Sequence, residues 1–310
     1  MPVLSICIPT YNRADYLATT LESIVGQNGF AKVEIIISDN CSSDRTREVA
    51  LEYVNKYPGQ IIYNRNEKNL IDGNIPKVLS LGHGDFLKLQ NDTAPLRPNA
   101  LELMLETIQS AKDSGKTLPF FINGNISGTE RVLCDNLDEF IAKTRYFNTW
   151  IAAFGIWREM LPQVLRILTA TVKTRLTQSY ALLTVVSQGW KVLVDPAVLF
   201  DSITPKKKGG YNVAEVFGRN YNNILQHFNS KKALSDKAYE KAKKDLVPFI
   251  NYYYFDPNKE FAFDKNGYLK WMLPLYWNKL YFYLYFVHAI WSDLRARRKR
   301  LSRLIRGKNK

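Results

Sequence analysis

The stretch SICIPTYNR, residues 5–13, joins an apolar run to a short polar segment. Residues 3–9, VLSICIP, have the length and composition of a buried strand. Residues 34–46, EIIISDNCSSDRT, repeat the arrangement, because an apolar run again ends in Asp, Asn and Ser. Such residues are typical of turns and of the first positions of helices. The two stretches predict strands that end in polar loops, each followed by a helix.

Strand and helix patterns alternate along the first hundred residues. Strands are expected at 33–38, 60–64, 85–90 and 119–123, and a further short one at 191–194. Between the first two strands, Leu17, Leu21 and Ile24 recur at helical spacing. Strands separated by helices predict βαβ units around a mostly parallel sheet, which is an α/β fold. Ligands of such sheets bind beyond the carboxyl ends of the strands.

The later part of the chain is expected to be mainly helical. Helices are predicted near 74–81, near 176–188 and over 211–250, the last including a solvated amphipathic helix at 231–247. Lys206–Gly210 is expected to be a mobile loop. We therefore divide the chain into residues 1–205, a helical extension at 206–270 and a tail at 271–310.

Composition excludes several classes of protein. With 310 residues, of which 46% are hydrophobic and 23% charged, the chain is neither disordered nor collagen-like. Its three cysteines, Cys7, Cys41 and Cys134, are spaced neither as a disulfide framework nor as a metal knuckle, so a reducing cytosol is expected. No basic segment precedes residues 3–9, which favours a strand over a signal peptide.

The positive charge is concentrated at one end. Residues 292–310 carry nine Lys or Arg against Asp293, a net +8 of the total +14. The remainder of the chain is mildly basic. This distribution argues against general nucleic-acid binding, and no nucleic-acid partner is expected. It indicates one localised anionic partner.

An aromatic segment comes directly before that basic end. Residues 271–291 contain nine Phe, Tyr or Trp, and Pro274, Asn278, Lys279 and His288 interrupt them. A spanning helix needs about 20 mainly apolar residues, whereas Tyr and Trp prefer the headgroup region. We predict a helix lying in the membrane interface, with the polybasic segment on anionic lipid.

Four polar clusters follow or adjoin the predicted strands: Pro9–Arg13, Ser38–Asp44, Asn69–Lys77 and Gln90–Pro95. Each has a plain interpretation as a turn, a loop or a helix cap. Each also has a chemical one. Arg13 and its loop could bind a nucleotide, and Asp39 could accept hydrogen bonds from a base or a sugar. Asp92 could bind a hard cation such as Mg²⁺.

In their order and spacing, these stretches resemble the family 2 glycosyltransferases of the GT-A fold, inverting enzymes that build bacterial surface polysaccharides. The resemblance rests on residues 5–13, 34–46, 69–74 (NLIDGN) and 84–95 (GDFLKLQNDTAP), covers residues 1–110 well and extends loosely over the middle. It implies a Rossmann-like, mostly parallel sheet flanked by helices, with a helical C-terminal region. Residues 1–205 would then be the catalytic domain.

The resemblance also implies site residues. Those for the nucleotide sugar are Pro9, Thr10, Tyr11, Arg13, Asp39, Asn74, Lys77, Asn91 and Asp92. Asp92 falls where the DxD metal motif of the family begins, which implies Mg²⁺ or Mn²⁺. In Asn91-Asp92-Thr93, however, the second carboxylate is missing.

The catalytic base stays unassigned. The family places an Asp or Glu at the start of the helix before Gly189, but Thr177, Gln178 and Ser179 stand there. The other available acids are Asp195, Glu159 and Asp201, and spacing selects none of them. Trp150 and Trp157 could stack on acceptor sugars or pack in the core.

The leading interpretation is inverting transfer of a sugar from a nucleotide sugar to a hydroxyl of a lipid-linked oligosaccharide. Such an enzyme of O-antigen, capsule or lipooligosaccharide synthesis would be peripheral, at the cytoplasmic face of the bacterial inner membrane. The alternative is a non-catalytic nucleotide-sugar-binding or scaffold protein of the same fold, favoured by the incomplete metal motif and the missing base.

Overall fold

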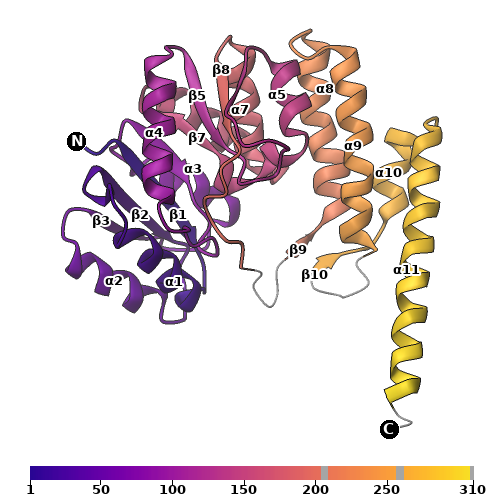
Figure 1. Ribbon diagram of the computed structural model, residues 1–310, viewed down its shortest axis with the longest axis horizontal. Coiled ribbons are helices and arrows are strands. Elements are labelled where there is room, and N and C mark those ends of the chain that lie inside the picture. The colour runs from indigo at the N-terminus through magenta and orange to yellow at the C-terminus, as the bar shows by residue number, and fades with distance from the viewer. Residues whose placement is uncertain (204–208, 256–261, 308–310) are drawn as a thin grey trace. The chain divides into compact units, whose positions relative to one another are not determined.

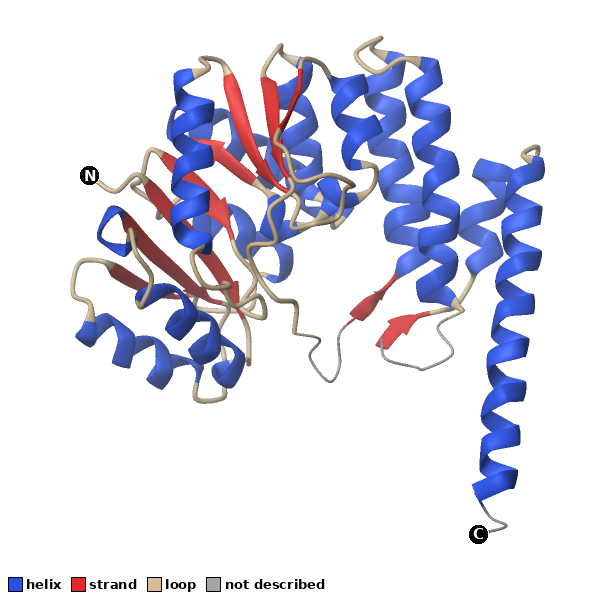
Figure 2. Ribbon diagram, viewed as in Figure 1, coloured by secondary structure: helices blue, strands red, loops and turns tan. Residues whose placement is uncertain are grey.

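The computed structural model describes residues 1–203, 209–255 and 262–307 (Figure 1). The chain forms two compact units, Met1–Ile203 and Thr204–Lys310. The first contains the sheets of the α/β fold, and the second is mainly helical (Figure 2).

The first unit is built on a five-stranded sheet with the order β3-β2-β1-β4-β7. Strands β1 (Leu4–Thr10), β2 (Val33–Asp39), β3 (Ile61–Arg65) and β4 (Phe86–Leu89) are parallel. Strand β7 (Gly155–Trp157) pairs antiparallel with β4. The central strands are buried, as expected for a sheet covered by helices. The α/β fold with a mostly parallel sheet is therefore confirmed.

Helices connect these strands and flank the sheet. They are α1 (Ala14–Val25), α2 (Thr46–Lys56), α3 (Asn74–Leu79) and α4 (Ala100–Asp113). Leu17, Leu21 and Ile24 of α1 are fully buried, as their spacing predicts. Each of the four parallel strands begins and ends within two residues of its predicted position.

A second, three-stranded sheet lies in the same unit, with the order β5-β8-β6. Strand β5 (Thr117–Phe121) is parallel to β8 (Lys191–Asp195), and β6 (Val132–Cys134) is antiparallel to β8. The strand predicted at 119–123 thus pairs with a strand some 70 residues later rather than with β4. Helices α5 (Leu137–Thr144), α6 (Leu161–Thr171) and α7 (Thr177–Ser187) complete the unit.

The second unit begins its described part with a strand. Strand β9 (Gly209–Asn212) is parallel to β10 (Ala262–Asp264). The prediction of a loop at Lys206–Gly210 is therefore wrong for Gly209 and Gly210, which lie in this strand. The rest of that expectation lies outside the described residues. A π-helical stretch (Ala214–Tyr221) continues into α8 (Asn222–Ser230), and α9 (Asp236–Tyr254) follows. The amphipathic helix therefore starts at Asp236, later than the expected residue 231. Ser235 caps this start, because its side chain accepts a hydrogen bond from Ala238 N.

The aromatic segment does not form the single helix predicted over 271–291. Helix α10 (Tyr268–Tyr276) ends within the aromatic segment, and α11 (Leu280–Gly307) begins after a break. Tyr276 and Phe282 are buried, and the Tyr276 hydroxyl donates to the carbonyl of Lys243 at 3.0 Å. Part of the aromatic content is therefore the core of this unit. No helix in the described ranges has both the length and the apolar content needed to cross a bilayer.

Candidate active site

The carboxyl ends of β1, β2 and β3 lie side by side, which gathers their polar loops. The strand register places Thr10 beside Asp39 and Asp39 beside Arg65. Beyond the strands, Asn40 N donates to the Thr10 carbonyl, and Asn66 N donates to the Asp39 carbonyl, each at 2.9 Å. The edge of the sheet where α/β proteins bind ligands is therefore continued by ordered loops.

Asp92, beyond the end of β4, is joined to the loop after β1. Thr10 Oγ1 donates to Asp92 Oδ2 at 2.9 Å, and Arg13 Nη1 donates to Asp92 Oδ1 at 2.8 Å. The Thr20 hydroxyl of α1 donates to the Asp92 carbonyl at 2.8 Å. Burial raises the pKa of Asp92, while Arg13 and Thr10 oppose that rise. Thr10 and Asp92, which are 82 positions apart in the sequence, are thus within hydrogen-bond distance of each other.

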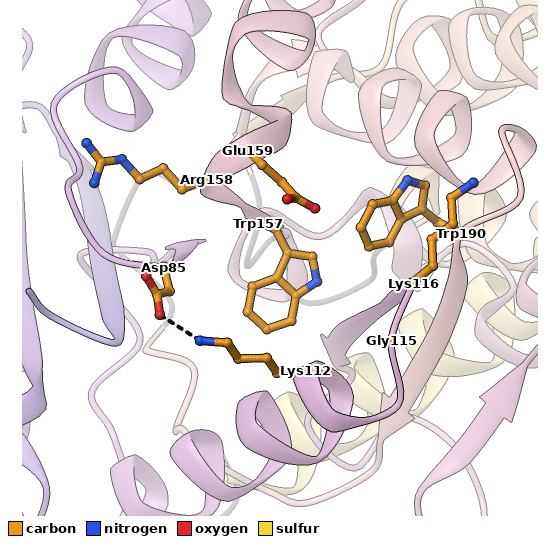
Figure 3. Close-up of a pocket in the computed structure, with 8 residues that line it drawn as sticks. All are labelled: Asp85, Lys112, Gly115, Lys116, Trp157, Arg158, Glu159 and Trp190. Carbon is orange, nitrogen blue, oxygen red and sulfur yellow. Dashed lines mark hydrogen bonds and ion pairs between the residues drawn. The ribbon is translucent and has the colours of Figure 1, made fainter.

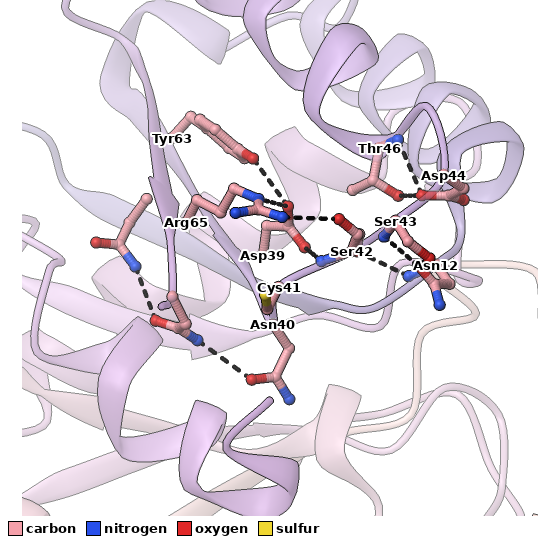
Figure 4. Close-up of polar contacts among 12 residues, drawn as sticks. Asn12, Asp39, Asn40, Cys41, Ser42, Ser43, Asp44, Thr46, Tyr63 and Arg65 are labelled. Carbon is pink, nitrogen blue, oxygen red and sulfur yellow. Dashed lines mark hydrogen bonds and ion pairs between the residues drawn. The ribbon is translucent and has the colours of Figure 1, made fainter. Parts of the chain in front are cut away.

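Asp39 is fully buried and anchors the loop after β2 (Figure 4). Its Oδ1 accepts from Ser42 N at 2.9 Å, and its Oδ2 accepts from the Tyr63 hydroxyl at 2.8 Å. Arg65 Nε lies 3.7 Å from Oδ2. Asp39 therefore stabilises the loop that follows β2, and its carboxylate lies at the end of that strand.

A network of asparagines holds the next loop. Asn74 accepts from the Ser38 hydroxyl at 2.6 Å and donates to the Ser38 carbonyl at 2.8 Å. Asn66 Nδ2 donates to Asn74 at 2.9 Å, and Asn40 Nδ2 donates to Asn69 at 2.8 Å. The cluster at 69–74 is thus tied to the end of β2.

Asp44 acts as a cap, as its position suggests. Its Oδ1 accepts from Thr46 N at 3.0 Å at the start of α2, and its Oδ2 accepts from Ala14 N at 3.1 Å at the start of α1. One carboxylate therefore joins the amino ends of two helices, and these hydrogen bonds help to hold the pKa of Asp44 below its usual value.

Three other predicted residues lie outside this hydrogen-bonded cluster. Pro9 is within β1, where it pairs with Ser38 in the register. Tyr11 is exposed in the loop. Lys77 lines a groove of about 450 Å³ between α3 and α6.

The structure places Glu159 and Trp157 away from the carboxyl ends. Both line a pocket of about 550 Å³ together with Asp85, Lys112 and Trp190 (Figure 3). Asp85 directly precedes β4, so this pocket adjoins the amino ends of the parallel strands. Trp157 is buried, and its Nε1 donates to the Thr117 carbonyl at 2.7 Å. These positions favour core packing for Trp157 and speak against Glu159 as the base.

Asp195 and Asp201 are both engaged in contacts within the first unit. Asp195, at the end of β8, accepts from Thr107 Oγ1 at 2.5 Å and from Arg131 Nε at 3.2 Å. Asp201 forms an ion pair with Arg97 at 2.8 Å. The backbone N of Asp201 donates to the Pro95 carbonyl at 3.0 Å, but neither carboxylate forms a hydrogen bond or ion pair with Asp92 among the described residues. The geometry therefore assigns neither as the base.

The start of α7 holds amides and hydroxyls where the resemblance implies an acid. Gln178 is buried, and its Nε2 donates to the Thr149 carbonyl at 2.7 Å. Its Oε1 has no hydrogen-bond partner among the described residues. The neighbouring Trp150 is partly exposed and packs edge-on against Phe200 at 5.1 Å.

Sequence reasoning missed Lys88 of β4. Its side chain is fully buried, and Nζ donates to Gln90 Oε1 at 2.6 Å, to the Ala152 carbonyl at 2.7 Å and to the Leu89 carbonyl at 3.1 Å. Burial lowers the pKa of Lys88 to about 7. The sequence feature that could have identified Lys88 is a charged residue in a strand whose other residues are apolar. Lys88 connects the loop that carries Asp92 to the segment before β7.

The residues around Asp92 do not fit the divalent cation that the resemblance implies. Both Asp92 oxygens already accept hydrogen bonds, and Asn91 and Thr93 supply no charge. Asn91 Oδ1 is buried without a partner among the described residues, but it is a neutral oxygen. In the described parts of the chain no three His, Cys, Asp or Glu side chains could hold a metal together. Mg²⁺ requires a nearly octahedral shell that includes carboxylates and several waters.

Residues 5–154 match the model of glycosyl transferase family 2. The N-terminal half of the chain therefore carries a domain of this family. Its resemblance to family 2 glycosyltransferases is therefore confirmed, and the matched residues include β1 to β4 and the loops that carry Thr10, Asp39 and Asp92.

Curated relatives match the same N-terminal part. The chain is 39% identical over 113 residues to the abequosyltransferase RfbV of Salmonella typhimurium, an alignment covering 36% of this chain and 34% of RfbV. It is 35% identical over 108 residues to the GalNAc(5)-diNAcBac-PP-undecaprenol beta-1,3-glucosyltransferase of Campylobacter jejuni, covering 34% of each. The chain thus spans about a third of the length of the curated relatives it matches.

Solved structures share the fold. TarS 1-349 of S. aureus in complex with UDP-GlcNAc aligns with a TM-score of 0.57 at 16% identity, covering 96% of this chain and 81% of TarS. The mannosyltransferase PcManGT of Pyrobaculum calidifontis, in complex with GDP-Man and Mn²⁺, aligns with 0.51 at 15% identity, covering 94% and 87%. The GT-A fold expected from the sequence is therefore confirmed.

Proposed function

We propose that this protein is an inverting glycosyltransferase that moves a sugar from a nucleotide sugar to a hydroxyl of a lipid-linked oligosaccharide in bacterial surface polysaccharide synthesis. The observation that carries the proposal is the convergence of Thr10, Arg13, Asp39 and Asp92 at the carboxyl edge of the sheet in a family 2 domain. The acceptor class is suggested by the Campylobacter jejuni relative, which is named for an undecaprenol-linked saccharide.

Each part of the site has a role in this proposal. Asp39 and the asparagine network shape the loops that receive the nucleoside. Arg13 is assigned to the diphosphate, because a guanidinium matches phosphate oxygens in charge and geometry. An acceptor hydroxyl would attack the anomeric carbon from the face opposite the nucleotide, and the bond from that carbon to the diphosphate oxygen would break as the new glycosidic bond forms. The nucleoside diphosphate leaves with the bonding electrons, the configuration inverts in one step, and the acceptor hydroxyl loses its proton. Neither Glu159 nor Asp195 is proposed as the group that accepts its proton.

We also propose that the second unit brings the enzyme to the cytoplasmic surface of the inner membrane. An exposed apolar stripe begins in the break after α10 and runs along α11; it consists of Trp277, Leu280, Leu284, Val287, Trp291 and Leu294. The spacing of three and four residues places the members in α11 on one helix face. The strongly basic residues 292–310 follow, a combination that binds anionic interfaces.

Turnover of a nucleotide sugar tests the enzymatic proposal. Purified protein is incubated with UDP-, GDP-, CDP- and dTDP-sugars, each with and without membrane lipid extract, and release of nucleoside diphosphate is measured. We expect release from one donor class that increases when the lipid extract is present. Binding of a nucleotide sugar without any release would instead support the scaffold alternative, which the missing acid at Gln178 favours.

A further inference from the structure

We propose that Arg13, held in place by Asp92, neutralises the donor diphosphate in place of a divalent cation. The inference rests on the proposed function, which supplies the nucleotide donor. It reassigns Asp92 from a metal ligand to a positioning residue that fixes the guanidinium.

The first argument is that both oxygens of Asp92 are already hydrogen-bonded and the residue is buried. Its Oδ1 accepts from Arg13 at 2.8 Å and its Oδ2 accepts from Thr10 at 2.9 Å. The residue is 1% exposed. A cation that keeps several waters in its coordination shell would need space that is not present around this buried carboxylate.

The second argument is electrostatic. A divalent ion at either Asp92 oxygen would lie a few ångströms from the Arg13 guanidinium, and like charges at that distance repel strongly where water is excluded. Asp92 supplies a single negative charge, which Arg13 already neutralises. Asn91 and Thr93, on either side, contribute none.

The third argument is the way in which Arg13 is presented. Its Nη1 is bound to Asp92, whereas Nε and Nη2 have no hydrogen-bond partner within the described part of the chain. The side chain is 39% exposed, so these donors are accessible. A fixed guanidinium with unused donors is suited to two phosphate oxygens.

The experiment measures nucleotide binding by calorimetry, in 1 mM EDTA and again in 5 mM MnCl₂ or MgCl₂. The probes are UDP, GDP, CDP and dTDP, followed by the monophosphate of the tightest binder. We expect the Kd of the diphosphate to differ by less than about twofold between EDTA and metal. Tightening by tenfold or more with either metal would overturn the inference while leaving the proposed function intact. Failure of all four diphosphates to bind would contradict both.

Variants of Arg13 separate its role from folding. Arg13→Met is expected to weaken diphosphate binding about tenfold or more in EDTA, with less than threefold effect on the monophosphate. Because it leaves the Asp92 carboxylate buried and unpaired, Arg13→Met/Asp92→Asn is measured beside it, and thermal unfolding reports folding. Arg45→Met, which removes an exposed charge at the start of α2, is the matched control and should bind like the wild type. Wild-type diphosphate affinity in both folded Arg13 variants would overturn the inference.

The converse change supplies an independent readout. Asn91→Asp/Thr93→Asp installs two carboxylates beside Asp92. We expect this variant to bind Mn²⁺ by itself, detected by the paramagnetic effect of the ion on water relaxation, whereas the wild type shows no such binding. Equal Mn²⁺ binding by the wild type would contradict the inference.

Discussion

At the scale of single residues, Lys88 is the most unusual group in the first unit. Its ammonium is buried beside three neutral oxygens, and the described residues give it no carboxylate partner. Removing a charge from water without an opposite charge is unfavourable, which is why the pKa of Lys88 falls to about 7. The three hydrogen bonds nevertheless hold two loops, and the neutral amine, which has two N–H groups, can donate to two of the three oxygens.

Lys88 should make the stability of the protein depend on pH. Because its folded pKa, about 7, lies below the unfolded value of about 10.4, the folded state binds fewer protons between these values. The free energy of unfolding is therefore expected to rise by up to about 1.4 kcal/mol per pH unit above pH 7. Urea unfolding from pH 6.5 to 8.5 measures this slope.

The control for that slope is Lys88→Met, which removes the titrating group but keeps a long side chain. The difference in unfolding free energy between wild type and variant should grow in favour of the wild type as the pH rises from 7. Two parallel curves over this range would show that Lys88 does not titrate there. The comparison ends at pH 8.5 because the buried Cys7, whose pKa is raised, adds an opposite dependence above the usual thiol pKa.

Asp39 is predicted to affect donor binding more than the chemical step. Asp39→Asn keeps the shape of the side chain but removes the charge that Tyr63 and Ser42 contact. A lost charge-assisted hydrogen bond typically weakens binding by about 10- to 100-fold. We expect the donor KM to rise by about tenfold or more while kcat changes less than threefold. A fall in kcat at saturating donor with unchanged KM would contradict this role.

At the scale of elements, the antiparallel pairing of β7 with β4 depends on close approach at Gly155. Lys88 of β4 is opposite Gly155 in the register, and the Phe86 ring packs edge-on against Trp157 at 5.1 Å. A Cβ on Gly155 would overlap the Phe86 ring. This strand therefore requires glycine for space rather than for backbone freedom.

Gly155→Ala is accordingly expected to destabilise the first unit by about 1–3 kcal/mol, because the ring must leave its position in a well-packed core. The urea midpoint measures the effect. Gly26→Ala, after α1, is the matched control, since nothing lies within 4 Å of a Cβ there and its φ of −87° suits alanine. Equal midpoints for the two variants would show that the Phe86 ring adapts without cost.

The sequence predicted those elements whose signal is local. Strands β1 to β4 were predictable because each is an apolar run that ends in turn residues. Strands β6 and β7 are three residues long, too short for any periodicity, and the partner of β5 lies some 70 residues away. Likewise, an aromatic run at 271–291 does not reveal which rings are covered by α9, so Tyr276 was expected at a lipid surface but lies in the core.

In the candidate site, too, only features with a local signal could be predicted from the sequence. Thr10, Asp39 and Asp92 were predictable because parallel strands gather their carboxyl ends. The pairing of Arg13 with Asp92 was not, since sequence spacing carries no information on which loop residue reaches which strand end. Lys88 was overlooked because lysine in a strand is usually solvated.

At the scale of the whole molecule, charge and apolar surface are concentrated on the same element. Helix α11 carries the exposed stripe Leu280, Leu284, Val287, Trp291 and Leu294 and continues into the basic residues 292–310. Arg295 lies over the Trp291 ring at 4.9 Å, which places a cation beside an aromatic ring of the stripe. Such a helix should bind through two separable contributions, burial of apolar carbon and attraction to anionic headgroups.

Vesicle sedimentation separates the two contributions. Binding to vesicles with 30% anionic lipid should weaken several-fold between 50 and 300 mM NaCl, and binding to neutral vesicles should be weak at both, because screening reduces only the electrostatic part. Leu284→Gln/Trp291→Gln should reduce binding at both salt concentrations. Tyr252→Gln, an exposed residue of α9 in the same unit, is the control. Wild-type binding by the double variant would show that the stripe does not contact lipid.

The asparagine network after β2 has a consequence for how the protein responds to its medium. Asn40, Asn66, Asn69 and Asn74 bear no charge, so neither acidity nor dissolved ions weaken the bonds among them. The loops held by these asparagines should therefore stay the same across buffers, whereas the charged pair of Arg13 and Asp92 should respond to them. Any dependence of substrate binding on the buffer should accordingly come from Arg13 and Asp92.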